Sequence, residues 1–136
     1  MIMTNTSITK DFFESSHKNS IINTDRKNLL LKIAHKIAEN YRLNENQVNI
    51  NFICTHNSRR SQLGQVWTFF ASNYFDLQIN AFSGGTEVTA FHRNTVKTLQ
   101  EVGFHFNVEE FSHLNPKYRI SYTGSHKSLL GFSKIY

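Results

Sequence analysis

Hydrophobic positions along the first half of the chain follow two periods, one typical of helices and one typical of strands. Over residues 25–41 apolar side chains recur every three or four positions, which predicts an amphipathic helix with Asn23 or Thr24 as its cap. Over residues 48–54 apolar and polar side chains alternate, which predicts a strand. Residues 61–74 return to the helical period. The pattern therefore predicts a helix, a strand and a second helix.

The second half of the chain continues this alternation. Residues 77–81 have the period of a strand and run into a serine and two glycines, while residues 91–102 suit a third helix that is closed by Gly103. Strand, helix, strand and helix in this order predict a parallel sheet with crossover helices. Beyond them, residues 118–122 favour a strand, and an apolar run covers residues 129–135.

The length of 136 residues fits one compact domain. We expect this single domain over residues 23–136, after a polar arm over residues 1–22 that forms a short helix or an ordered arm outside the core. Because the sequence stops inside the apolar run, we expect a fold that is truncated at its C-terminus.

Composition and charge exclude several classes of function. The formal net charge of +5 favours anionic partners, but the basic residues are scattered, so we expect no nucleic-acid binding. There is no apolar run long enough for a membrane span and no signal-peptide pattern, which predicts a cytoplasmic protein without a membrane partner. The seven histidines lack metal-ligand spacing, so we expect no metal. One cysteine allows no internal disulfide, and it is either a packing residue or a reactive thiol.

The surroundings of that cysteine favour the reactive thiol. The segment CTHNSRRS places Cys54 after the first strand, Arg60 six positions later and Ser61 at the start of a helix. A loop that wraps an oxyanion needs inward backbone N–H groups, a helix N-terminus and a planar guanidinium. A helix N-terminus also lowers the pKa of a cysteine thiol. We therefore predict that Cys54 is a thiolate nucleophile and that Arg60 clamps an oxyanion.

The other loop residues have supporting roles in this hypothesis. Ser61 can donate its hydroxyl to the sulfur, and Asn57 can hold the loop through backbone bonds because it tolerates left-handed conformations. We expect Arg59 to point outward as a solvated charge. Three further residues complete the predicted oxyanion-binding loop: Thr55, His56 and Ser58.

Two segments also resemble a known family. FICTHNSRRSQ resembles the first strand and phosphate loop of the low-molecular-weight protein tyrosine phosphatase superfamily, including its arsenate reductase branch. Residues 81–104 resemble the second strand of that family, its Ser-Ala-Gly-Thr-like turn and the following helix. The resemblance spans about residues 48–104 and implies a three-layer α/β/α fold around a central parallel sheet.

The resemblance implies a phosphomonoester hydrolase that needs no cofactor. Its substrate would be a phosphotyrosine protein or a small phosphomonoester, Cys54 would form a phosphocysteine, and Arg60 would bind the equatorial oxygens. His56 stands where phosphatases of the family usually have glycine. The family's late Asp, commonly followed by Pro, has no match after Cys54, so the general acid is unassigned.

Two alternatives stay open at this point. The first is an arsenate reductase that binds arsenate and uses external thiols, because Cys54 is the single cysteine of the sequence. The second is a non-catalytic module that binds phosphate or another oxyanion. The sequence predicts no oligomeric state.

Overall fold

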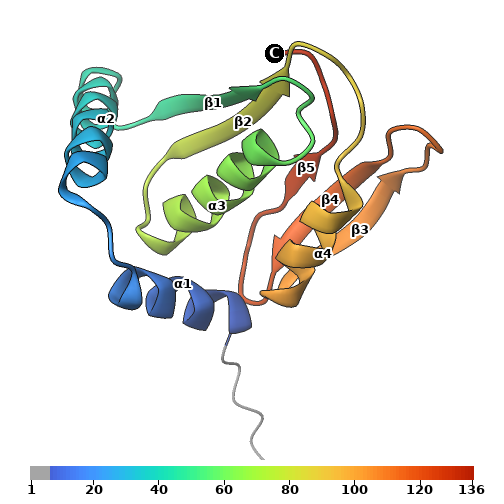
Figure 1. Cartoon of the computed structure of the whole chain (residues 1–136), viewed down its shortest axis with the longest axis horizontal. Helices are drawn as coiled ribbons and strands as arrows, with labels where there is room; N and C mark the ends of the chain where they lie inside the picture. Colours follow the sequence, from blue (N-terminus) through green and yellow to red (C-terminus); the bar gives the residue numbers. More distant parts are fainter. Residues whose placement is uncertain (1–6) are drawn as a thin grey trace, which may run out of the picture.

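A computed structural model describes residues 7–136; the first six residues of the predicted N-terminal arm lie outside the described part. Helices and strands alternate over much of its length, which confirms an α/β fold (Figure 1). The elements are α1 (Ile8–Asn19), α2 (Thr24–Leu43), β1 (Val48–Cys54), α3 (Arg60–Tyr74), β2 (Ile79–Gly85), α4 (Arg93–Glu101), β3 (Phe104–Glu110), β4 (Lys117–Tyr122) and β5 (Leu129–Gly131). The division into an arm and one domain stays a prediction.

Strands β1 and β2 form the parallel pair that the sequence predicts. Val48 is opposite Ile79 at one end, and Cys54 is opposite Gly85 at the other. Helix α3 is the crossover connection and packs against both strands. Because parallel strands end at the same edge, the loop after β1 and the turn after β2 lie side by side.

The remaining strands form a separate antiparallel sheet in the order β3-β4-β5. The parallel pairing in the described fold consists of β1, β2 and an isolated bridge from Gly85 to Ile135, and β3, β4 and β5 do not extend the predicted parallel sheet. The reason is local: residues 111–116 are too short for the crossover that parallel neighbours need, so β3 turns back onto β4. Strand β3 itself was not predicted, although Phe104, Phe106 and Val108 alternate with polar residues.

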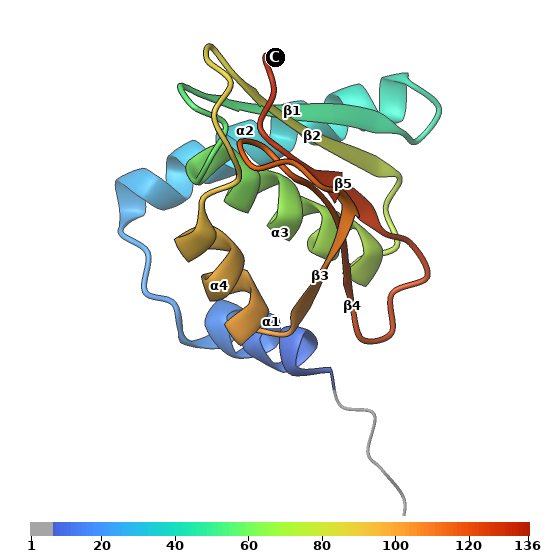
Figure 2. The ribbon, with the colours of Figure 1, turned by 90° about the vertical axis from the view of Figure 1, so that its right-hand side faces the viewer.

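Helix α3 lies between the two sheets and carries much of the core (Figures 1 and 2). Its predicted apolar face supplies Val66 and Phe70, both of which are buried. The rest of the core cluster comes from the segment before α4, from α4 and from the antiparallel sheet: Phe91, Leu99, Phe104 and Ile120. Packing on both sides holds the N-terminus of α3 in a defined position below the loop.

The short helix expected in the N-terminal segment is present as α1. Its N-cap is Ser7, whose hydroxyl accepts a hydrogen bond from the Lys10 N–H at 3.2 Å. The expectation that this segment lies outside the core is only partly met, because Phe13 packs against the core cluster. Its ring centroid lies 5.0 Å from that of Phe70 and 5.0 Å from that of Tyr74.

Helix α2 confirms the predicted amphipathic helix and one of its two predicted caps. The Asn23 side chain accepts a hydrogen bond from the Arg26 N–H at 2.8 Å. None of the helix residues is buried, so its apolar side chains are half-exposed, for example Leu29 at 48% and Ile33 at 49%. Within residues 7–136, no helix is both long and apolar enough to cross a bilayer.

The core position of Leu99 yields a stability prediction. Leu99 is 0% exposed, whereas Leu114 is 85% exposed. We expect Leu99→Ala to lower the free energy of unfolding by about 2–5 kcal/mol, because it removes buried methyl groups and leaves a cavity. Leu114→Ala should change it by less than about 0.5 kcal/mol. Urea unfolding followed by circular dichroism measures both, and equal losses would contradict this assignment of the core.

Candidate active site

Cys54 ends β1 and leads into a loop that is held by the turn after β2. The Thr55 carbonyl accepts hydrogen bonds from the N–H groups of Thr86 at 2.8 Å and Glu87 at 2.9 Å. Gly85 lies so close that a Cβ atom on it would be 2.5 Å from the Thr55 carbonyl oxygen and 2.8 Å from the Asn57 nitrogen. The absence of a side chain at Gly85 is therefore a condition for the observed loop.

Asn57 organises the interior of the loop, as predicted from its tolerance of left-handed backbone. It is fully buried with φ of 47°. Its Oδ1 accepts hydrogen bonds from the Lys134 backbone N–H at 3.0 Å and from Gln62 Nε2 at 3.1 Å. Its Nδ2 donates to Ser61 Oγ at 2.8 Å.

The Ser61 hydroxyl links the Asn57 amide to the cysteine. Ser61 Oγ lies 2.9 Å from Cys54 Sγ and already accepts from the Asn57 amide. Its own proton is thereby free to point at the sulfur, which is the direction that stabilises a thiolate.

The pKa of Cys54 lies below its ordinary value. Partial burial by itself would raise this pKa, but several hydrogen bonds outweigh it: first that of the Ser61 hydroxyl, then those of the backbone N–H groups of Ser61, Asn57 and Ser58. The loop therefore favours the reactive, charged form of the thiol.

An open cleft of about 740 Å³ lies above the sulfur. Its lining is Cys54, His56, Ser58, Arg59, Arg60 and Thr89. Arg60 is the first residue of α3, and the helix start has no side-chain cap. Two guanidinium groups and a helix N-terminus give this cleft the chemistry of an anion site, and its volume leaves room for a leaving group or a thiol beside the anion.

Arg59 differs in part from its predicted role. Its side chain is exposed, as expected, but its Nη2 lies 2.9 Å from Nε2 of His92, and it lines the cleft together with Arg60. His92 in turn caps α4 by accepting from the Asn94 N–H at 3.1 Å. The contact links one wall of the cleft to α4.

At the rim, the predicted loop residue His56 contacts three residues that were not predicted as site residues: Glu87, Thr89 and Ser133. His56 Nε2 lies 3.2 Å from Glu87 Oε2, both half-exposed or more. The His56 carbonyl accepts hydrogen bonds from Thr89 Oγ1 at 3.0 Å and Ser133 Oγ at 2.8 Å. No local sequence signal marks Glu87, Thr89 or Ser133, because each contact joins segments more than 30 positions apart.

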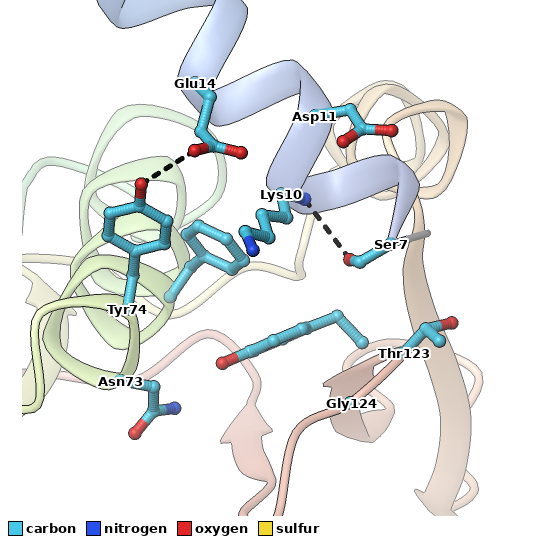
Figure 3. Close-up of a pocket in the computed structure, with 10 residues that line it drawn as sticks. Ser7, Lys10, Asp11, Glu14, Asn73, Tyr74, Thr123 and Gly124 are labelled. Atoms are coloured by element: carbon cyan, nitrogen blue, oxygen red, sulfur yellow. Dashed lines mark hydrogen bonds between the residues drawn. The ribbon is translucent and has the colours of Figure 1, made fainter. Parts of the chain in front are cut away.

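A second cleft lies at the opposite end of α3, where α1 meets the turn after β4 (Figure 3). It combines Lys10 with Asp11 and Glu14, and Glu14 Oε2 accepts a hydrogen bond from the Tyr74 hydroxyl at 2.9 Å. That hydrogen bond raises the pKa of Tyr74. The second cleft holds no cysteine and mixes both signs of charge. Among residues 7–136, no cluster of three or more His, Cys, Asp or Glu side chains could hold a metal ion.

Fold and site together define a class: an α/β protein with a cysteine in a loop, between a strand and a helix, that has the chemistry of an anion site. Curated relatives match part of this chain. An arsenate reductase of Brevibacillus brevis is 39% identical over 59 residues, which cover 43% of this chain and 42% of the relative. An arsenate reductase of Bacillus cereus strain ZK is 38% identical over 58 residues, covering 43% and 41%.

A further arsenate reductase, of Bacillus anthracis, is 36% identical over 58 residues. These matches confirm the resemblance to the low-molecular-weight phosphatase and arsenate reductase superfamily. In each match the aligned residues span about two fifths of the relative, 41% to 42% of its length. No family model matches the chain, and no solved structure matches it significantly.

The contact between Ser61 and Cys54 yields a prediction about the thiol. We expect Ser61→Ala to raise the pKa of Cys54 by about one unit, because a hydrogen bond to the charged form is lost. The pH dependence of iodoacetamide alkylation measures this pKa. Ser128→Ala, an exposed serine outside the cleft, should leave it unchanged. An unchanged profile in Ser61→Ala would show that the hydroxyl does not stabilise the thiolate.

Proposed function

We propose that this chain reduces arsenate through a nucleophilic Cys54. The observation that carries the proposal is the position of Cys54 Sγ, 2.9 Å from the Ser61 hydroxyl at the base of a cationic cleft. The similarity to proteins named arsenate reductase favours arsenate over a phosphate ester. Arsenate and phosphate are both tetrahedral oxyanions, so the loop itself suits either.

The chemistry would proceed in three steps. The Cys54 thiolate attacks arsenic, an S–As bond forms, and one arsenate oxygen leaves as water after it takes up protons. A thiol then attacks the Cys54 sulfur, the electron pair of the S–As bond passes to arsenic, and arsenite leaves. A second thiol reduces the mixed disulfide, which restores Cys54 and yields one oxidised thiol pair for each arsenate.

Arg60 and the N-terminus of α3 would hold the oxyanion in this scheme. Both belong to the cleft that contains Cys54, and preorganised donors of this kind would stabilise the negative charge that develops during the attack. Because Cys54 is the single cysteine of these 136 residues, the reducing thiols would come from another molecule, such as glutathione or thioredoxin.

The phosphomonoester hydrolase is the second candidate, and the loop geometry favours it equally. In that reaction Cys54 attacks the phosphorus of a phosphotyrosine protein or a small phosphomonoester, the P–O bond breaks and the phenol or alcohol leaves. Water then attacks the phosphocysteine, which releases phosphate and restores Cys54. A group must protonate the leaving oxygen. His56 and Glu87 are the titratable pair at the rim of the cleft, 3.2 Å apart, and would be the candidates for this role. The three-layer α/β/α arrangement around a central parallel sheet belongs to the same family-based proposal.

One set of assays separates the candidates. Wild type should release arsenite from arsenate in the presence of glutathione or thioredoxin, and Cys54→Ser should release none. Arg60→Ala should lower the rate by about 10²–10³-fold, because it removes a transition-state donor. Arg26→Ala removes an exposed arginine on α2 and should leave the rate unchanged.

Hydrolysis of p-nitrophenyl phosphate is measured with the same variants. Cys54-dependent hydrolysis without arsenite release would favour the phosphatase instead. Phosphate binding without either turnover would favour the non-catalytic module.

A further inference from the structure

A lysine from the end of the described chain lies behind the loop. Lys134 Nζ is 3.2 Å from Ser83 Oγ, 3.1 Å from the Phe132 carbonyl oxygen and 3.4 Å from Asn57 Oδ1. Over residues 7–136 no carboxylate forms an ion pair with it. The Lys134 ammonium is therefore held by neutral acceptors beside the cysteine loop.

The surroundings of this ammonium are partly dry and uncharged. Burial lowers the pKa of Lys134 to about 8, so most of the molecules still carry the proton at pH 7. Its acceptors are Ser83 of β2, Asn57 of the loop and the Phe132 carbonyl, and Gln62 and Gln65 of α3 are hydrogen-bonded to these acceptors. None of these groups titrates. Lys117 of β4, paired with Glu110, lies across the Phe132 ring, 4.7 Å from its centroid.

We propose that the Lys134 ammonium is a positioning residue that orients the Asn57 amide and thereby stabilises the Cys54 thiolate. The inference rests on the proposed function of Cys54 as a nucleophile and adds a residue from a distant segment to that site. Lys134 does not line the cleft, so it acts through Asn57 and not by contact with the substrate.

The donors around Asn57 fix the orientation of its amide. Asn57 Oδ1 faces three donors: Gln62 Nε2, the Lys134 N–H and Lys134 Nζ. A flipped amide would turn its own N–H groups toward these donors, which is unfavourable in a buried site. The Asn57 Nδ2 must therefore donate to Ser61 Oγ, and the Ser61 proton is left for Cys54 Sγ.

Substitution of Lys134 isolates the ammonium. Lys134→Met keeps the backbone N–H that donates to Asn57 and removes only the charge and its hydrogen bonds. We expect the pKa of Cys54 to rise, but by less than in Ser61→Ala, because Gln62 and the Lys134 backbone N–H still donate to Asn57 Oδ1. Alkylation by iodoacetamide as a function of pH measures it. Lys127→Met removes an exposed lysine and should have no effect, and Lys134→Arg should restore most of the low pKa.

A second measurement uses the intact wild type and covers the case in which Lys134→Met does not fold. The side-chain amide ¹⁵N resonance of Asn57 should titrate near pH 8, as Lys134 loses its proton. A low Cys54 pKa in wild type that persists in folded Lys134→Met, or an Asn57 resonance without this titration, would overturn the role of Lys134. An ordinary Cys54 pKa in wild type would instead overturn the proposed function.

Discussion

The fixed orientation of the Asn57 amide is the interaction on which the candidate site depends. Its buried side chain accepts from α3 and from the C-terminal segment, and it donates to Ser61, which contacts Cys54 Sγ. With φ of 47°, the backbone also turns the loop around the sulfur. Contacts with distant segments thus fix the Asn57 amide, and the Asn57 amide fixes the direction of the Ser61 hydroxyl proton.

The fold brings the partners of Asn57 together through the parallel pair. Strands β1 and β2 end at the same edge, and Gly85 N donates to the Lys134 carbonyl at 2.8 Å, which aligns the C-terminal segment beside the loop. The aromatic and aliphatic core between α3 and the antiparallel sheet holds α3 on the side that points away from the parallel strands. Chemistry at Cys54 therefore depends on contacts far beyond the loop's own sequence.

Local patterns were enough to predict β1, the loop, α3, β2 and the left-handed Asn57, because each has a short-range period or a residue with a backbone preference. They did not show that α3 buries Gln62 and Gln65 on its second face, since buried amides depend on distant partners such as the Ala81 carbonyl. Neither the position of Lys134 nor the contact of His56 with Glu87 could be predicted, because both also depend on partners that are distant in the sequence. The antiparallel sheet was partly foreseen, through β4, while β3 was missed.

The central claim is that a thiolate at Cys54 lies at the base of an oxyanion site. Its most direct test is the rate of Cys54 alkylation at neutral pH, measured while arsenate is titrated into the wild-type protein. The structure predicts alkylation faster than that of an ordinary thiol, because the lowered pKa of Cys54 raises its thiolate fraction, and saturable protection, because a bound anion would cover the sulfur. Alkylation at the rate of an ordinary exposed thiol, unaffected by arsenate, would contradict it.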